Sequence, residues 1–171
     1  THAFGGELET SHRAAVRIVE QFDRVHVESP YDWMILSAGG APYDVNGIQA
    51  IKALIGTYQA VRPGGTIFFF AECPEGIPEW LLQATEVQDP RLLRERIASG
   101  TLILGHNALW LEQIRRHCRI VMVTELSPAT VERLGFQYAK ADEVRGQLSR
   151  LTVESTHGVI AHLGNLLFAT S

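Results

Sequence analysis

The segment DWMILSAGGAPYDVNGIQAIKAL, at positions 32–54, contains the change from strand to helix that decides the fold. Its first part, 32–38, is a short apolar run that ends at a Gly-Gly pair, as expected for a buried strand. From 45 to 60 the apolar residues recur at helical spacing. They are Ile48, Ile51, Leu54, Ile55 and Tyr58. A strand followed by an amphipathic helix is the unit from which parallel sheets are built.

The same alternation continues along the chain. Further strands are expected at 24–29, 66–73, 119–125 and 158–164, with a turn at 62–65. Further helices are expected at 10–22, 75–85, 89–99, 106–118, 127–136 and 141–151. We therefore predict one α/β domain over residues 1–171, a mostly parallel sheet with helices on both faces in a three-layer α/β/α arrangement.

Length and composition are those of an ordinary soluble globular protein. The chain has 171 residues, a net charge of −4 and 46% hydrophobic residues, which gives no reason to expect nucleic-acid binding. The longest apolar run, at 65–73, has the length of a strand and is too short for a membrane span. Cys73 and Cys118 fit free thiols, which favours a cytoplasmic protein over one with a disulfide framework.

Three strand ends are candidates for a ligand site, because ligands of open parallel sheets bind beyond the carboxyl ends of the strands. They are LSAGGAPYD at 36–44, FFFAECPEG at 68–76 and MVTELSP at 122–128. In the first, Gly39 and Gly40 would let the backbone approach a ligand closely.

Gln49 and Lys52 form a polar pair on one face of the expected helix, because they are three residues apart. Isoleucines flank Lys52, so its ammonium group could be partly desolvated and suited to proton transfer or to binding an anion. Alternatively, Lys52 lies on a solvated face and extends its ammonium group into water.

His106 follows a short apolar run and precedes a helix, where it could be a general base, a donor to a ligand or simply a polar residue at a helix start. The spacing of the other histidines predicts no metal site. Neither a phosphate-binding loop of the Walker type nor a dinucleotide fingerprint is present around Gly39 and Gly40. Cys73 as a nucleophile is a further possibility, although its surroundings match no cysteine-hydrolase signature.

These segments resemble the C-terminal domain of the nickel-dependent lactate racemase family. The resemblance rests mainly on 32–54, with support from 61–77, 104–127 and the closing HGVIAHLG at 157–164. The family has a Gly-Gly-x-Pro-x-Asp-x-Asn turn followed by a helix with Gln-Ala-x-Lys. The matching residues here are Gly39, Gly40, Pro42, Asp44, Asn46, Gln49, Ala50 and Lys52.

The resemblance implies a C-terminal domain of a racemase or epimerase that acts on a small 2-hydroxy acid. Family enzymes place the active site between two domains and use a nickel pincer nucleotide, held mainly by an N-terminal domain that is not part of these residues. Catalysis there resembles hydride abstraction from C2, with two histidines of the N-terminal domain as acid and base. Gln49 and Lys52 match catalytic and cofactor-facing positions. Gly39, Gly40, Lys52 and His106 are the expected substrate contacts, and the isolated chain is expected to be inactive and without cofactor.

Two positions depart from the family pattern. His106 stands where lactate racemase has a tryptophan facing the cleft, so the substrate need not be lactate. Gly47 stands where relatives usually have a larger aliphatic residue. Two alternatives therefore stay open, a non-catalytic module that binds an anion or regulates, and a small hydrolase or transferase built on Cys73 or His106.

Overall fold

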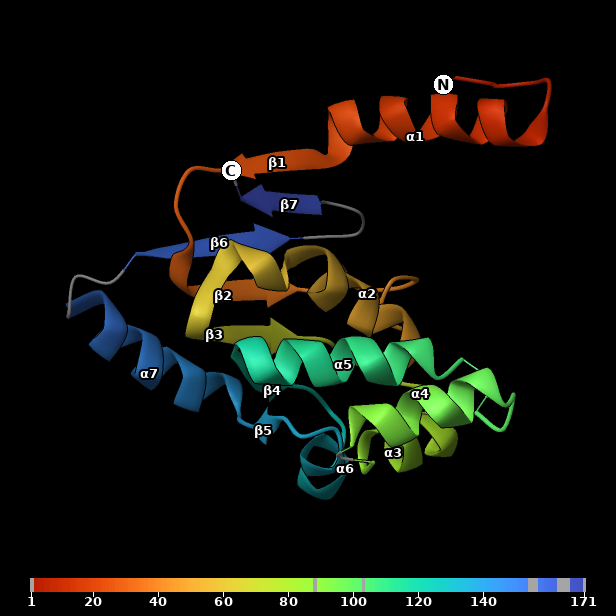
Figure 1. The fold of residues 1–171 in the computed structure, drawn as a ribbon. Coiled ribbons are helices and arrows are strands. Elements are labelled where there is room, and N and C mark those ends of the chain that lie inside the picture. Colours follow the sequence, from red (N-terminus) through yellow and green to blue (C-terminus); the bar gives the residue numbers. More distant parts are fainter. Residues whose placement is uncertain (1, 88, 103, 154–156, 163–166, 171) are drawn as a thin grey trace.

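The computed structural model describes residues 2–87, 89–102, 104–153, 157–162 and 167–170. Its centre is a five-stranded sheet with the order β5-β4-β3-β2-β6, in which every neighbouring pair is parallel (Figure 1). The strands are β2 (Tyr31–Ser37), β3 (Val61–Phe70), β4 (Arg119–Val123), β5 (Gln137–Tyr138) and β6 (Gly158–His162). The predicted parallel α/β fold is confirmed.

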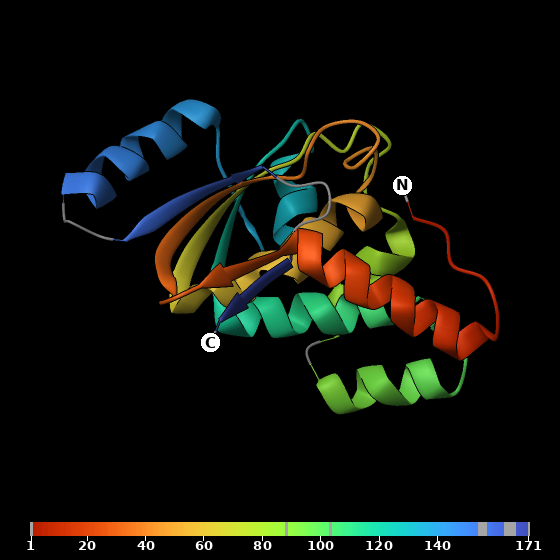
Figure 2. The ribbon, with the colours of Figure 1, turned by 90° about the horizontal axis from the view of Figure 1, so that it is seen from above.

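Helices cover both faces of the sheet. The helices of the described part of the chain are α1 (Leu8–Asp23), α2 (Gly47–Thr57), α3 (Glu79–Thr85), α4 (Pro90–Ala98), α5 (His106–His117), α6 (Pro128–Arg133) and α7 (Ala141–Val153). Figure 2 shows α7 on one side of the sheet and α2 and α5 on the other. None of the helices in the described part of the chain is long and apolar enough to span a bilayer.

The alternation of side chains along the strands builds two cores. Phe68 and Phe69 are neighbours in β3, and both are fully buried because each belongs to a different face of the sheet. Phe69 packs in the larger core with apolar residues of α2, α3 and α5. Phe68 packs in the smaller core with Trp33, Val121 and residues of α7. The two cores explain why β3 reads as a continuous apolar run.

Several elements differ from the sequence prediction. The strand expected at 24–29 forms, as β1 (Arg24–Val27), but it pairs with β7 (Leu167–Thr170) in a separate two-stranded parallel sheet. β7 was not predicted. The helix expected to reach 136 ends at Arg133, because Gly135 adopts a positive φ of 75° and the chain then enters β5.

The turn predicted at 62–65 lies inside β3 instead. Between two registered pairs, β2 advances from Tyr31 to Trp33 while β3 advances from Val61 to Thr66. The extra residues of β3 include Gly64, whose φ is 79°. The turn-forming residues therefore produce an irregularity within one strand and do not end it.

Candidate site at the carboxyl ends of the strands

The loop after β2 is tied to the loop after β3 by Asp44. This carboxylate is buried, with 5% of the residue exposed, and its Oδ2 accepts a hydrogen bond from the backbone N–H of Glu72 at 3.1 Å. The backbone carbonyl of Asp44 accepts from the N–H of Cys73 at 3.0 Å. Asp44 thereby fixes the position of one strand-end loop relative to the other.

Asn46 sets the start of α2. Its Oδ1 accepts a hydrogen bond from the backbone N–H of Gln49 at 3.2 Å, which caps the helix, and its Nδ2 donates to Oε2 of Glu75 at 3.0 Å. Gly39 and Gly40 have φ values of 104° and 74°, a region that side chains disfavour, and they turn the chain out of β2. These contacts together fix the position of the first turns of α2.

Gly47 fits the same local packing. A Cβ atom added at this position would lie 2.1 Å from Cδ1 of Ile77, which belongs to the loop after β3. In this chain the side chain of Ile77 fills the space that a larger residue at position 47 would need.

The three strand ends singled out in the sequence enclose one hollow of about 310 Å³. It is lined by Ser37, Gly40, Asp44, Phe70, Ala71, Glu72, Val123, Thr124 and Glu125. Three of these side chains are carboxylic acids, and none of the lining residues is a lysine or an arginine. The hollow therefore disfavours an anionic group inside it, while its hydroxyl and carboxylate oxygens can accept hydrogen bonds.

Gln49 and Lys52 lie outside this hollow, on the face of α2 that points away from the sheet. Nζ of Lys52 donates a hydrogen bond to Oε1 of Gln49 at 2.6 Å, and this contact is exposed. The desolvated lysine considered from the sequence is therefore not found in this chain, in which the ammonium group meets water. The pair is a preformed polar surface at the start of a helix.

His106 is exposed at the first position of α5 and lines a different hollow, of about 450 Å³, with Arg94, Trp110 and Gln113 among its neighbours. The structure therefore does not place His106 in the hollow that Gly40 lines.

The packing of α2 and α5 nevertheless places His106 and Lys52 at a similar height along these two helices. Nε2 of Gln113, near the end of α5, donates a hydrogen bond at 2.7 Å to the hydroxyl of Tyr58, directly after α2. Because α2 and α5 pack side by side with these ends together, they run in the same direction. Lys52 lies about two helical turns before Tyr58, and His106 lies about two turns before Gln113. The two residues therefore lie at a similar height along the parallel helices.

Cys73 is placed like a structural residue. Its side chain is buried, with 1% of the residue exposed, and burial raises the pKa of the thiol to about 12, with a further contribution from the charge of Asp44. At neutral pH the group is a thiol and a poor nucleophile. This observation counts against a hydrolase or transferase built on Cys73.

The same burial predicts an alkaline loss of stability. The pKa of Cys118 is also raised to about 12 by burial, from an ordinary value of 9.0. Because the unfolded chain releases these protons first, each cysteine stabilises the fold below pH 9, and this stabilisation is lost between pH 9 and about 12. We expect urea unfolding at pH 8 and pH 10.5 to show a larger fall in stability for the native sequence than for Cys73→Ala/Cys118→Ala. An equal fall in the two proteins would contradict the assignment.

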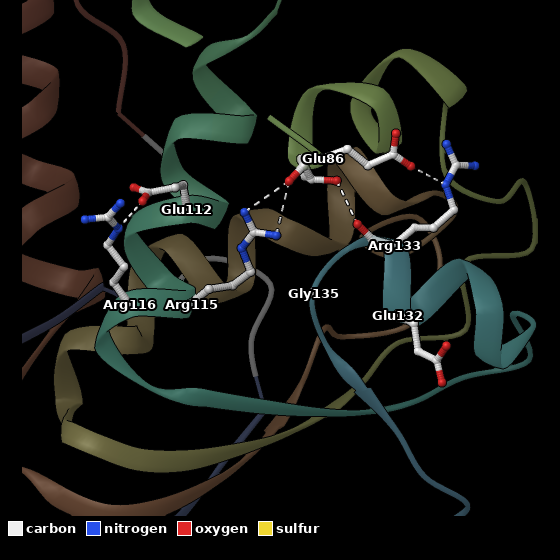
Figure 3. Close-up of a pocket in the computed structure, with 8 residues that line it drawn as sticks. Glu86, Glu112, Arg115, Arg116, Glu132, Arg133 and Gly135 are labelled. Carbon is white, nitrogen blue, oxygen red and sulfur yellow. Dashed lines mark hydrogen bonds and ion pairs between the residues drawn. The ribbon is translucent and has the colours of Figure 1, made fainter. Parts of the chain in front are cut away.

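A further hollow, of about 540 Å³, lies among α3, α5 and α6 (Figure 3). Its arginines form ion pairs or hydrogen bonds with other groups of the protein. Arg133 pairs with Glu79 and Glu86, and Arg116 pairs with Glu112. Arg115 donates hydrogen bonds to the carbonyls of Thr85 and Leu134, and desolvation lowers its pKa. Sequence patterns gave no sign of this network, which joins helices and leaves these cations occupied.

Among the described residues, no group of three or more histidine, cysteine, aspartate or glutamate side chains could hold a metal ion. His117 illustrates the structural use of histidine here. Its Nε2 lies 2.7 Å from the carbonyl oxygen of Val61, and its ring packs edge-on against Tyr58. The expectation that the chain supplies no metal ligands stays a prediction.

Comparison with known proteins identifies the family to which the chain belongs. The model of the lactate racemase C-terminal domain matches residues 26–153, which include all of the strand-end loops described above. The chain belongs to the lactate racemase C-terminal domain family. Within that family it is 30% identical over 132 residues to a lactate racemase from Thermoanaerobacterium thermosaccharolyticum.

Solved structures support the same lactate racemase-like fold. The apoprotein of the lactate racemase from Thermoanaerobacterium thermosaccharolyticum superposes with a TM-score of 0.77, 23% identity and 94% of this chain covered. A protein from Thermotoga maritima superposes with a TM-score of 0.63, 12% identity and 95% of the chain covered. The chain spans only 30% of the length of the first relative, 40% of its solved structure and 42% of the second structure.

Proposed function

We propose that this lactate racemase C-terminal domain belongs to a nickel-pincer-nucleotide-dependent racemase or epimerase that acts on a small 2-hydroxy acid. Its contribution is the exposed pair of Gln49 and Lys52. The observation that carries the proposal is the placement of this pair, on a helix whose start is fixed by Asn46 and by the loop tied through Asp44. An amide and an ammonium group held there suit a cleft shared with a second domain.

The charge distribution supports a role for Lys52 in binding an anion. Every 2-hydroxy acid carries a carboxylate at neutral pH, and the acidic hollow beside Glu72 and Glu125 disfavours that group. The ammonium group of Lys52 attracts it. Covering this face with a second domain would exclude water and strengthen the attraction. Lys52 would then hold the substrate carboxylate or an anionic group of the cofactor.

The residues of this chain fit one part of the cofactor. The half-buried amide of Gln49 and the exposed ammonium group of Lys52 are donors that suit the phosphate of a nucleotide, whereas the described residues offer no cluster for the nickel ion. When bound, the pincer nucleotide supplies a hydride acceptor for C2 of the substrate. This chain would orient the anionic groups, and the N-terminal domain would hold the metal and move the hydroxyl proton.

Substrate contacts are proposed for three further residues. The backbones of Gly39 and Gly40 would approach the substrate where β2 ends, since neither residue has a side chain in the way. His106 would contact it from the start of α5, at a height along the helices similar to that of Lys52. A polar imidazole at this place favours a substrate with a hydrogen-bonding substituent over one with only a methyl group.

Exchange of the C2 hydrogen tests the proposal. The full gene product, made together with the enzymes that synthesise the cofactor, should exchange the C2 deuterium of at least one member of a panel of 2-hydroxy acids. The 171-residue chain alone should exchange none, because its described residues offer no cluster that could hold the nickel ion. Nickel-free gene product with no exchange on any acid would favour the non-catalytic module, and exchange by the isolated chain would contradict the proposal.

A further inference from the structure

An apolar stripe runs along α1 on the surface of this domain. Leu8, Val19 and Phe22 are 84%, 48% and 72% exposed, and their spacing of eleven and three residues places them on one face of the helix. Ala15 lies between them on the same face. Charged residues, among them the ion pair of Glu9 and Arg13, occupy the other face. The helix therefore has the amphipathic pattern of a packed helix with its apolar side uncovered.

The position of α1 explains why the stripe stays bare. Figure 1 and Figure 2 show α1 at the periphery, continuing from β1 and away from the five-stranded sheet. The N-terminal residues extend the patch, because the ring of His2 lies 6.4 Å from that of Phe22 and Phe4 is 43% exposed. Most helices in proteins owe their stability to packing of the apolar face, so an uncovered stripe of this kind indicates an interface.

The two comparisons treat α1 differently. The family model begins at residue 26, after α1 has ended. The match to the solved racemase covers 94% of this chain, too much to leave out the whole of the 16-residue helix. That solved chain is longer, since this chain accounts for 40% of it. Part or all of the helix is thus included in the match to the racemase structure, while it precedes the segment that matches the C-terminal-domain model.

We propose that the stripe formed by Leu8, Val19 and Phe22 is the docking surface for the N-terminal domain of the same racemase-like protein, an inference that rests on the proposed function. Three side chains offer far less than the ~800 Å² per partner of a typical stable interface between free proteins. A covalently joined domain needs less contact, because the linkage raises its effective concentration. The size of the stripe therefore favours a tethered domain over a second copy of the chain.

Limited proteolysis of the full gene product tests this inference. We expect Leu8→Ser/Phe22→Ser to make cleavage between the two domains about tenfold faster or more, because apolar anchors dominate interface energies. Arg13→Ser, on the opposite face of α1, is the matched control and should cleave at the rate of the native sequence. The C-terminal domain released from the double variant should keep the native unfolding midpoint, which separates loss of docking from loss of folding.

Other outcomes overturn the inference in distinguishable ways. Equal cleavage of the double variant and the native gene product would show that the stripe does not hold the domains together. A native protein that dimerises through the stripe, and a double variant that is monomeric with unchanged cleavage, would assign the surface to a second copy. C2 exchange and nickel content of the native gene product are measured separately from cleavage. If the double variant is cleaved faster but the native gene product shows no C2 exchange and no bound nickel, the docking surface is supported and the proposed function is overturned.

Discussion

Replacing Lys52 with alanine in the full gene product is expected to lower the proposed turnover of a 2-hydroxy acid by about a hundredfold or more. Removing a single group that stabilises charge in an active site typically has an effect of this size. Lys52 is exposed in this domain and bonds only within α2, to Gln49, among the contacts the structure describes. The substitution should therefore leave the fold intact, and steady-state kinetics should show the loss at unchanged nickel content.

Lys140 provides the control, because it is the other lysine of the chain and is also exposed. Lys140→Ala should retain native turnover, since this residue lies just before α7 on the far side of the sheet. Lys52→Arg keeps the charge and should recover part of the activity lost in Lys52→Ala. Full activity of Lys52→Ala would leave the family assignment in place and remove Lys52 from the proposed cleft.

Gly158→Ala is expected to lower the stability of the sheet. A Cβ atom at this position would lie 2.1–2.5 Å from atoms of the indole ring of Trp33, its partner across β2 and β6. Trp33 packs in the core with Phe68 and Val121, so the rigid ring has little room to move. Overpacking of this kind typically costs about 1–3 kcal/mol, which thermal or urea unfolding would detect.

Gly146→Ala is the matched control for this prediction. Gly146 is exposed within α7, and a Cβ atom added there would meet nothing within 4 Å. Alanine favours a helix over glycine by about 1 kcal/mol, so this variant should be more stable than the native protein. A Gly158→Ala variant as stable as the native protein would show that the ring of Trp33 does not occupy the place described.

The sequence predicts the architecture well because apolar periodicity reports burial directly. The strand at 32–38 and the helix at 45–60 follow from such patterns, and the structure has β2 and α2 there. β5 was missed because it has two residues, too few for any pattern. β7 was missed because its role is set by pairing with β1, a contact between the two ends of the chain.

The candidate site could be predicted only in part. The rule that ligands bind beyond the strand ends led to the hollow that contains Gly40, Asp44 and Glu72. The role of Asp44 as a buried acceptor depends on a contact with a loop that is distant in sequence, so spacing alone could not reveal it. The exposure of Lys52 depends on the face of α2 that the sheet buries. Flanking isoleucines suggested desolvation, but their own burial leaves Lys52 on the outer face.

The most direct test of the account is whether the substrate shields Lys52 in the full gene product. Reductive methylation followed by mass spectrometry would compare Lys52 with Lys140, with and without a 2-hydroxy acid that the enzyme turns over. We predict that the acid slows modification of Lys52 and leaves that of Lys140 unchanged, because the proposed cleft would include only the ammonium group of Lys52. Equal modification of Lys52 with and without the acid would contradict the proposal that the start of α2 faces the substrate.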